Sequence, residues 1–421
     1  MLMTNLMPVS LRTLPRDAAI LFLTRFTRLF AYGALSVVLV FYLVSLGITE
    51  TQVGLLLTLT LAGDMAISLL LTTRADRIGR RRMLIVGAVL MVGAGIVFAS
   101  TKNLLFLIVA GTIGVISPSG HEVGPFLSIE QAALSHVVPA RGRTEVFAWY
   151  TLAGSLATAF GALAGGAATE MAQRVSLSTS DSYRVVVLLY AALGVALAFL
   201  FSRLSSSAEV DPSAAAASRV SKRDFLGVGC SRSIVLKLSS LFALDSFGGG
   251  FVVQSFAAYW FYLRFGVPPA KLGLIFFWAN VLAGISALLA SRLASRIGLV
   301  RTMVVTHLPS NVLLVLVPLM PNLRLAVALL LVRFSISQMD VPTRHSYTMA
   351  VVRPDERSAA GGITGVARTA GAAISPIFAG FLFSRPALID IPFFVAGTLK
   401  IAYDLALYRG FRAIRPPEEA D

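Results

Sequence analysis

Residues 72–81, Thr-Thr-Arg-Ala-Asp-Arg-Ile-Gly-Arg-Arg, form a short basic connection between two long apolar runs. Part of this connection returns 219 residues later as Ser295-Arg-Ile-Gly298. The repeat is wider than the connection, because residues 47–86 and 266–305 share eleven identities in 40 positions, several of them polar or Gly. The sequence therefore predicts two related halves, each with a tight charged turn after its second apolar run.

The chain as a whole is too apolar for most classes of soluble protein. It has 421 residues, of which 56% are hydrophobic and 14% are charged, whereas soluble domains carry about 25% charged residues. Its single cysteine, Cys230, excludes an internal disulfide, and no Cys and His cluster has zinc-ligand spacing. The net charge of +15 would suit nucleic-acid binding on a soluble surface, but so apolar a chain offers little such surface. We therefore expect an integral membrane protein with no nucleic-acid partner.

Twelve apolar stretches are long enough to cross a bilayer as helices, for which about 20 residues suffice. They lie at residues 18–46, 51–73, 83–100, 103–136, 144–170, 184–203, 236–263, 270–293, 301–320, 323–350, 356–384 and 388–409. If the N-terminus is cytoplasmic, the inside segments hold 23 Lys and Arg residues and the outside segments hold 7. Because positive residues favour cytoplasmic loops, both termini are predicted to be cytoplasmic.

A long polar segment between the sixth and seventh stretches divides the chain. It is rich in Ser and Ala from Ser205 to Ser218, a composition typical of a flexible linker. We predict an N-terminal six-helix bundle over residues 1–203, a cytoplasmic linker over residues 204–235, and a C-terminal six-helix bundle over residues 236–421. Parallel repeats of six helices are one way in which secondary transporters are built.

The basic connection resembles the signature loop of the major facilitator superfamily, G-x-x-x-D-R-x-G-R-R, with Thr72 in place of the first Gly. The stretches Pro139 to Arg143 and Arg353 to Arg357 resemble the family's loops before its fifth and eleventh helices. The resemblance implies an all-α polytopic fold with 12 transmembrane helices in two six-helix pseudo-symmetric halves. It also implies a transporter that works by alternating access about a central cavity, and it does not specify a substrate.

The charged groups of the basic connection have two interpretations. The carboxylate of Asp76 can accept hydrogen bonds from Arg77, Arg80 or a helix N-terminus, while Gly79 permits a tight turn. In the family that the loop resembles, this cluster latches the halves in the outward-facing state, and such a contact biases the equilibrium between states. Alternatively, the five Arg residues between positions 74 and 82 only anchor the turn on the cytoplasmic side.

A glycine-rich stretch in the fifth apolar run bears on the direction of transport. Residues Gly161-Ala-Leu-Ala-Gly165-Gly166 resemble the drug-antiporter motif G-P-x-x-G-G, with Ala in place of Pro. The equivalent stretch of the second half keeps Pro376 and Gly380. The resemblance favours export over uptake, whereas the alternative is that small residues only let helices pack closely. We expect these five positions to serve helix packing or hinge motion.

Ionisable residues inside apolar runs are candidate site residues, because a charge within a bilayer needs a partner or a water-filled cavity. Arg333, Ser337, Asp340 and Arg344 follow one another at spacings that would place them on one helical face. This face could bind an anionic or polar substrate. Alternatively, Arg344 lies at the cytoplasmic interface and Asp340 only pairs with it.

Asp340 is also one of four acidic candidate proton carriers; the others are Asp245, Glu122 and Glu130. Asp245 lies in the seventh run, where burial would let its carboxylate titrate, and the alternative is a fixed ion pair with Arg333 or Arg368. Arg368 is itself a candidate site residue, as an isolated cation in the eleventh run. Glu122 and Glu130 lie in and after a Gly/Pro interruption of the fourth run. Such interruptions point to binding sites, unless the run simply ends there near the cytoplasm.

Two further pairs of charges have simpler expectations. Arg25 and Arg28, at the start of the first run, are expected to extend toward the lipid headgroups. Lys400 and Asp404, four residues apart in the last run, are expected to pair with each other.

These features predict a transporter and not an enzyme, since no Ser/His or metal constellation and no G-x-x-x-x-G-K-[ST] loop is present. The expected function is proton-coupled efflux of a small amphipathic or anionic molecule, with no cofactor beyond a proton gradient and no bound metal. The alternatives are a proton-coupled uptake symporter and, from another class, a non-transporting membrane receptor or assembly factor on the same fold. We expect a monomer in the plasma (inner) membrane, whose partners are its small-molecule substrate and the lipid bilayer.

Overall fold

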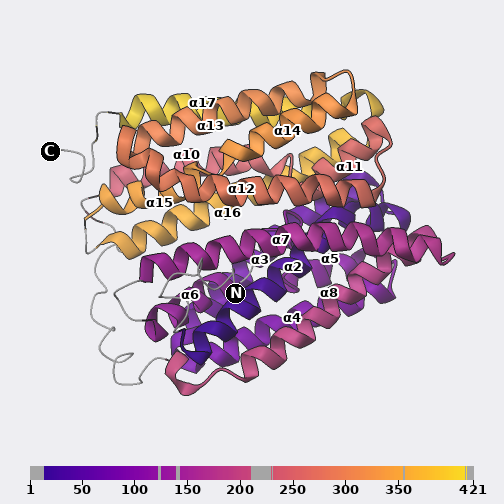
Figure 1. Cartoon of the computed structure of the whole chain (residues 1–421), viewed down its shortest axis with the longest axis horizontal. Helices are drawn as coiled ribbons and strands as arrows, with labels where there is room; N and C mark the ends of the chain where they lie inside the picture. Colours follow the sequence, from indigo (N-terminus) through magenta and orange to yellow (C-terminus); the bar gives the residue numbers. More distant parts are fainter. Residues whose placement is uncertain are drawn as a thin grey trace, which may run out of the picture.

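The fold is known from a computed structural model of the chain. It describes residues 14–121, 125–138, 143–209, 229, 231–353, 356–412 and 414, and in these ranges the side chains of residues 76, 77, 143, 144, 206 and 358 are excluded. Every regular element in this part of the chain is helical. The predicted all-α fold of two six-helix halves is confirmed, and the halves form two neighbouring bundles whose helices run side by side (Figure 1).

In the part of the chain that the structure describes, the first bundle contains seven helices and the second eight; the first has seven because its fourth span is broken in two. They are α2 (Arg16–Ser45), α3 (Glu50–Ile78), α4 (Arg80–Ser100), α5 (Leu104–Ile113), α6 (Phe126–Val137), α7 (Arg143–Arg174) and α8 (Thr179–Ser202). A short 3-10 turn, η1 (Ser206–Ala208), follows α8.

The second bundle has eight helices, because two of its spans are broken. They are α10 (Arg232–Gly250), α11 (Gln254–Phe265), α12 (Pro269–Ile297), α13 (Leu299–Leu316), α14 (Leu323–Ser337), α15 (Asp340–Ala350), α16 (Arg357–Phe383) and α17 (Ile391–Phe411). The short 3-10 turns η3 (Val317–Leu319) and η5 (Pro386–Leu388) lie in its connections.

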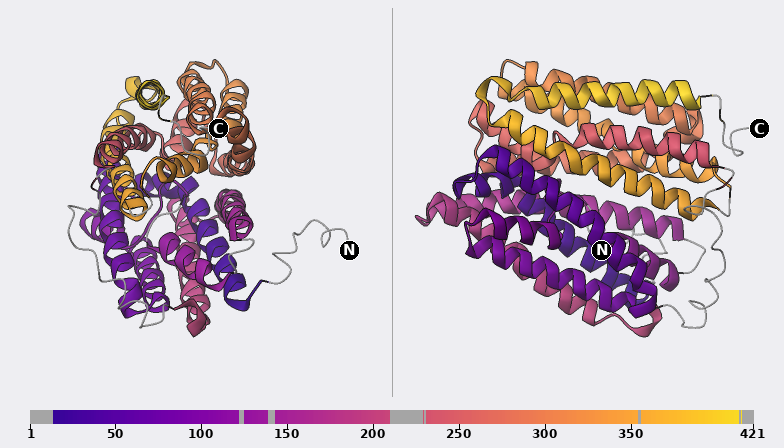
Figure 2. Two further views of the ribbon diagram at one scale, coloured as in Figure 1. Left: turned by 90° about the vertical axis from the view of Figure 1, so that its left-hand side faces the viewer. Right: turned by 180° about the vertical axis from the view of Figure 1, so that it is seen from behind.

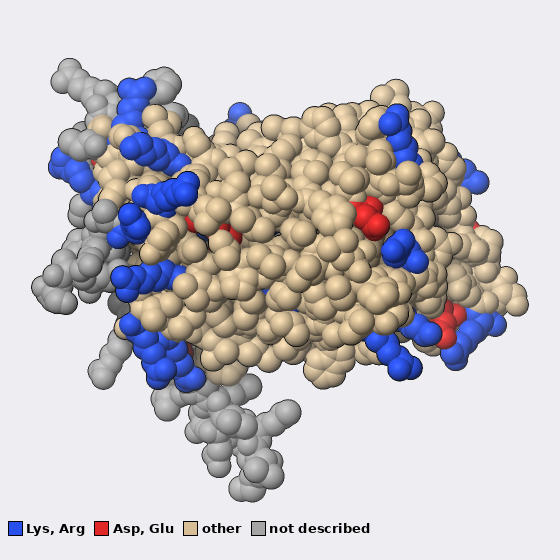
Figure 3. All heavy atoms as spheres, turned by 90° about the horizontal axis from the view of Figure 1, so that it is seen from above, with Lys and Arg blue, Asp and Glu red and all other residues tan. Residues whose placement is uncertain are grey.

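Within the described ranges, ten helices or joined helix pairs are long and apolar enough to cross a membrane. The other two of the twelve predicted spans are the broken pair α5 and α6, and α17, a 21-residue helix that carries Lys400 and Asp404. Charged side chains gather at the two ends of the molecule and leave an apolar belt between them (Figure 3). This distribution is the one that a bilayer requires of a spanning protein.

The two ends of the bundle are set by pairs of equivalent turns. Gly79 and Gly298 join the second and third spans of their halves, and we call this the basic end; Gly47 and Gly266 lie at the opposite, distal end. All four glycines have positive φ, between 64° and 114°, a conformation that residues with a Cβ rarely adopt. The repeat in the sequence is therefore a repeat of backbone geometry.

The interruption predicted in the fourth span is present, and an unpredicted one occurs in the tenth. The fourth span stops at Ile113 and resumes at Phe126. In the tenth, the helix is interrupted at Gln338 and Met339, so the prediction that Arg333 and Arg344 share one continuous helical face is wrong. Pro342 explains the break, because it has no N–H to donate to the carbonyl four residues earlier.

Two close helix contacts join the halves near the distal end. Gly380 of α16 lies against the backbone of Glu50 and Gly54 in α3, and Gly166 of α7 lies against the backbone of α12 at Gly273. The two contacts are copies of each other, since Gly54 and Gly273 are equivalent under the 219-residue shift. Small residues at such positions let backbones approach closely.

The other residues of the glycine motif lie at similar approaches. Gly161 and Gly165 place α7 against the backbone of α2 at Phe30 and Ala34, while the Pro376 carbonyl lies against Gly54. Away from the distal end the two bundles diverge, as the right-hand view of the ribbon shows (Figure 2). Packing therefore accounts for the small residues of the motif, and a hinge role for them stays a prediction.

We predict that Gly380→Ala destabilises the protein by about 1–3 kcal/mol, because the added Cβ would meet backbone atoms of α3 that cannot move aside. Thermal unfolding of the purified protein in detergent measures this change. Gly365→Ala on the same helix is the matched control, since nothing lies within 4 Å of a Cβ there. Equal unfolding temperatures for the two variants would contradict the predicted close contact.

Candidate functional site

The second bundle contains a buried polar network that links four helices. We call it the charged cluster, and its members are Asp245 of α10, His307 and Asn311 of α13, Asp340 and Arg344 of α15, and Lys400 and Asp404 of α17. All seven side chains are buried. Charges at this depth are rare unless they pair with one another and serve transport.

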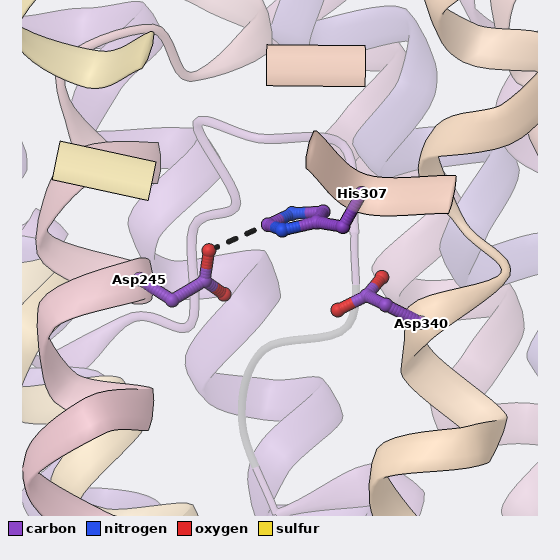
Figure 4. Close-up of side chains that lie close together, drawn as sticks. All are labelled: Asp245, His307 and Asp340. Atoms are coloured by element: carbon purple, nitrogen blue, oxygen red, sulfur yellow. Dashed lines mark ion pairs between the residues drawn. The ribbon is translucent and has the colours of Figure 1, made fainter. Parts of the chain in front are cut away.

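Asp245 is the centre of the charged cluster. Its carboxylate accepts a hydrogen bond from Lys400 Nζ at 2.6 Å and one from Arg344 Nη1 at 3.0 Å. His307 Nε2 lies 3.7 Å from the same carboxylate, and Asp340 faces this space from the other side (Figure 4). One carboxylate thus connects α10 to α13, α15 and α17.

His307 lies between two carboxylates. Its Nδ1 is 2.8 Å from Asp404 Oδ1, on the side of the ring away from Asp245. The Asn311 amide donates to the other oxygen of Asp404 at 2.9 Å. A protonated imidazole would therefore have an acceptor for each of its two N–H groups, and a neutral one would have an acceptor for its single N–H.

Two expectations about pairing along the chain are wrong. Lys400 and Asp404 do not pair with each other; they contact Asp245 and His307, respectively. The partners of Asp245 are Lys400 and Arg344, and not Arg333 or Arg368. For Lys400 and Asp404 the reason is that α17 packs against α10 and α13, which brings the buried groups Asp245 and His307 within reach of the two side chains.

Arg333 and Arg368 lie beside the charged cluster without joining it. Each interacts electrostatically with Asp245 and Asp340, but within the described part of the chain neither forms an ion pair. The Nε atom of each guanidinium is buried and has no hydrogen-bond partner, and the same holds for the Ser337 hydroxyl. These are donors for which the folded chain itself supplies no acceptor.

Among the described residues, the first bundle contains a fully buried ion pair. The guanidinium of Arg28 in α2 donates two hydrogen bonds of 2.7 Å to Glu130 in α6, and both side chains are fully buried. Thr24 and Tyr150 also donate to Glu130. Arg25 is buried over the ring of Tyr150 at 4.3 Å. The expectation that Arg25 and Arg28 extend to the headgroups is therefore wrong.

The two bundles carry this pair with inverted charge. Glu130 is the fifth residue of α6 and Arg344 the fifth of α15, and the 214-residue shift that aligns Gly166 with Gly380 also aligns these two. In each bundle the residue pairs with a charge in the first helix of its half: Arg28 for Glu130, and Asp245 for Arg344. The repeat thus preserves an interhelical link while exchanging its charges.

The remaining predicted residues fall outside this network. Glu122 and the side chains of Asp76 and Arg77 lie outside the described residues, so the latch at the basic connection stays a prediction. The turn at Gly79 is present, and the backbone N–H groups of Arg80 and Arg81 donate to the carboxylate of Glu209.

Several polar residues with clear partners were not singled out from the sequence, among them Glu209, His307 and Asn311. His307 and Asn311 are four residues apart in an apolar run, so they share a face of α13, and this spacing was an available signal. Glu209 had none, because a carboxylate in a linker does not reveal which helix N-terminus it binds.

The acidic and imidazole groups of Asp245, His307 and Asp340 have ligand atoms within 4.8 Å of one another, but Lys400 and Arg344 already pair with these carboxylates, so the set is better suited to ion pairing than to a metal.

Comparisons with known proteins agree with this architecture. A family model described as Major Facilitator Superfamily matches residues 21–376. The chain is 31% identical over 425 residues to the uncharacterized membrane protein YJR124C of Saccharomyces cerevisiae, with 95% of each chain covered. Two solved structures share the fold: a nucleoside transporter, NupG, at 13% identity and TM-score 0.71, covering 94% of this chain and 100% of that one, and a D-xylose-proton symporter at 15% identity and TM-score 0.70, covering 96% and 99%.

We predict that Glu130→Gln destabilises the protein by about 3–5 kcal/mol, because it removes the negative charge that faces the buried Arg28 guanidinium at 2.7 Å. Thermal unfolding in detergent again measures the change. Glu170→Gln is the control, since Glu170 pairs with Arg174 at 2.6 Å on an exposed surface, where such a pair contributes about 0–1 kcal/mol. A similar loss of stability in both variants would show that the buried pair contributes no more to folding than the exposed pair does.

Proposed function

Because the chain belongs to the major facilitator superfamily and is a membrane transporter of that fold, we propose that it moves a small anionic or amphipathic solute by alternating access and couples this movement to protons. The observation that carries the proposal is the charged cluster, in which His307 lies between the carboxylates of Asp245 and Asp404. No nucleotide-binding loop is present in the sequence, so an ion gradient is the proposed energy source.

Proton binding can act on the fold through the cluster. An imidazole titrates near neutral pH, and a proton on His307 would strengthen its attraction to both Asp245 and Asp404. It would also weaken the ion pairs of Asp245 with Lys400 and Arg344, because three cations would then share one carboxylate. These partners lie on α13, α15 and α17. Protonation would therefore change the strength of the interactions between α10 and these three helices, and with it the equilibrium between the facing states of the transporter.

The placement of hydrogen bonds between the halves suggests how the pathway opens. Gln254 of α11 donates to Ser36 of α2, and the N–H and hydroxyl of Ser255 both donate to the Pro118 carbonyl. Tyr259 also donates to Glu50 at 2.7 Å. These contacts lie toward the distal end, while the bundles diverge at the basic end (Figure 2).

We therefore propose that this state opens toward the basic end. We further propose that this end, with both termini, faces the cytoplasm and that the protein lies in the plasma membrane as a monomer. The excess of Lys and Arg at this end supports the orientation. The division into residues 1–203, 204–235 and 236–421 is part of the same proposal, with the halves as the units that rock.

The proposed direction of net transport is export. It is supported by the likeness of residues 161–166 to the drug-antiporter motif. Uptake by symport is the second candidate. It is favoured by the excess of cations around the charged cluster, because an anionic substrate drawn to these cations could bind together with a proton and cross with it. A receptor or assembly factor without transport activity is the rival from another class.

We predict that His307→Gln abolishes the response of transport to a pH gradient, because the ring that connects Asp245 to Asp404 can no longer take a proton. The assay uses proteoliposomes loaded with a library of small solutes, with mass spectrometry of what crosses when about one pH unit is imposed around the ordinary imidazole pKa of about 6.5. His136→Gln, which changes an exposed His of α6, is the matched control.

Asp245→Asn is expected to lower transport at every pH by about tenfold or more, because Lys400 and Arg344 lose their shared carboxylate. If His307→Gln kept its response to pH, coupling through the charged cluster would be refuted. If the wild-type protein bound solutes from the library but moved none of them, the receptor or assembly role would replace transport.

A further inference from the structure

The charged cluster and its two neighbouring arginines do not balance in charge. Within the described part of the chain, the three carboxylates of Asp245, Asp340 and Asp404 face four permanent cations. The cations are Arg333, Arg344, Arg368 and Lys400. With a neutral imidazole at His307, one positive charge is left over; Arg344 and Lys400 are buried, whereas Arg333 and Arg368 are half-buried. A net charge in so apolar a setting is strongly disfavoured unless a counter-ion reaches it.

The excess charge has an identifiable location. Arg344 and Lys400 are paired with carboxylates, while Arg333 and Arg368 are not. Arg333 lies over the ring of Phe334 at 5.0 Å, which stabilises a cation but does not accept a hydrogen bond. The unpartnered Nε atoms of Arg333 and Arg368, and the unpartnered hydroxyl of Ser337, are all buried. Arg333 and Ser337 are four residues apart in α14 and so share one face of it.

Unpaired guanidinium groups define the chemistry of what would bind. A guanidinium presents N–H donors in a planar fork that matches the two oxygens of a carboxylate or sulfonate. A hydroxyl adds one more donor to an oxyanion, and a single negative charge cancels a single excess positive one. A neutral solute would leave the excess positive charge without a counter-ion.

We infer that Arg333, Arg368 and Ser337 form a subsite for a small organic anion, which binds together with a proton carried at His307. The inference rests on the proposed transport function and names its substrate class. It also differs from a simple exchange of proton for solute, in which the two would compete for one site.

The joint binding follows from the sign of the charges. A proton on His307 adds positive charge beside the subsite, so it strengthens the attraction for an anion, and by linkage the bound anion strengthens proton binding. Proton and anion then cross in the same direction, and their combined gradients set whether net flow is inward or outward. The groups that face His307 are Asp245 on α10, Asp340 on α15, and Lys400, Tyr403 and Asp404 on α17. Arg333 on α14, Arg344 on α15 and Arg368 on α16 interact with the carboxylates of Asp245 and Asp340. The described charges of α12, Lys271, Arg292 and Arg296, lie toward its two ends.

Binding is tested on the full chain in detergent with benzenesulfonate and its uncharged analogue benzenesulfonamide. Thermal-shift measurements at about pH 6 and about pH 8, on either side of the ordinary imidazole pKa, are expected to show stabilisation by the sulfonate alone, with the larger shift at the lower pH. His307→Gln should remove the difference between the two pH values. Equal stabilisation by both probes, stabilisation by neither, or a larger sulfonate shift at the higher pH would overturn the inference.

Variants locate the subsite. Arg333→Gln and Arg368→Gln are each expected to weaken sulfonate binding about tenfold, whereas Arg324→Gln, an exposed cation on the same helix α14, should leave it unchanged. The unliganded Arg333→Gln and Arg368→Gln proteins should unfold at the wild-type temperature or above it, because the excess charge is removed. An unfolding temperature below wild type in both variants would show that these arginines are structural partners and would overturn the assignment.

Flux separates this inference from the proposed function. Proteoliposomes with an internal pH dye and a clamped membrane potential receive an inward gradient of benzenesulfonate, which stays anionic and does not carry protons across lipid by itself. Internal acidification as the sulfonate enters is the expected result. Alkalinisation would overturn joint transport while leaving proton coupling intact. Entry without any change in pH would refute the coupling in the proposed function itself, and no entry together with no binding would overturn the assignment of an anionic substrate.

Discussion

A carboxylate inside an apolar bundle is tolerated only while donors surround it, and the second half of this protein is organised around that requirement at Asp245. Its two oxygens take bonds from α15 and α17, and α13 approaches through His307. The four helices are thereby tied at one point in their interior, where water cannot substitute for a lost partner. A change of one proton at this point acts on all four helices together.

The first half meets the same requirement in a different way. Glu130 has its full set of donors, namely two from Arg28 and one each from Thr24 and Tyr150. Such a closed pair has little reason to rearrange, whereas the second half leaves guanidinium and hydroxyl donors without acceptors. Equivalent positions have thus diverged into a rigid link in one half and a responsive network in the other. The pseudo-symmetry of the backbone does not extend to the chemistry.

The sequence was sufficient for most of the fold and for part of the site. Apolar runs, the charged turns and the 219-residue repeat are local or periodic signals, and each reports directly on helix number and order. Asp245, Asp340 and Arg344 could be chosen because a charge in an apolar run is conspicuous. Their partners could not be chosen, since spacing along one helix identifies neighbours on that helix only. Lys400 and Asp404 illustrate the limit: their true partners lie on α10 and α13, and only the packing of α17 against both reveals them.

The backbone contacts of Gly54 with Gly380 and of Gly166 with Gly273 have a mechanical consequence. Side chains that interlock across an interface must change rotamer before the two surfaces can turn on each other, and each change adds to the barrier. Where glycines meet, no side chain stands in the way, so the surfaces can roll over one another with little reorganisation. The two symmetric contacts would then let the halves rotate about them with a low steric barrier. The rate of this rotation would be limited by the polar bonds elsewhere in the interface.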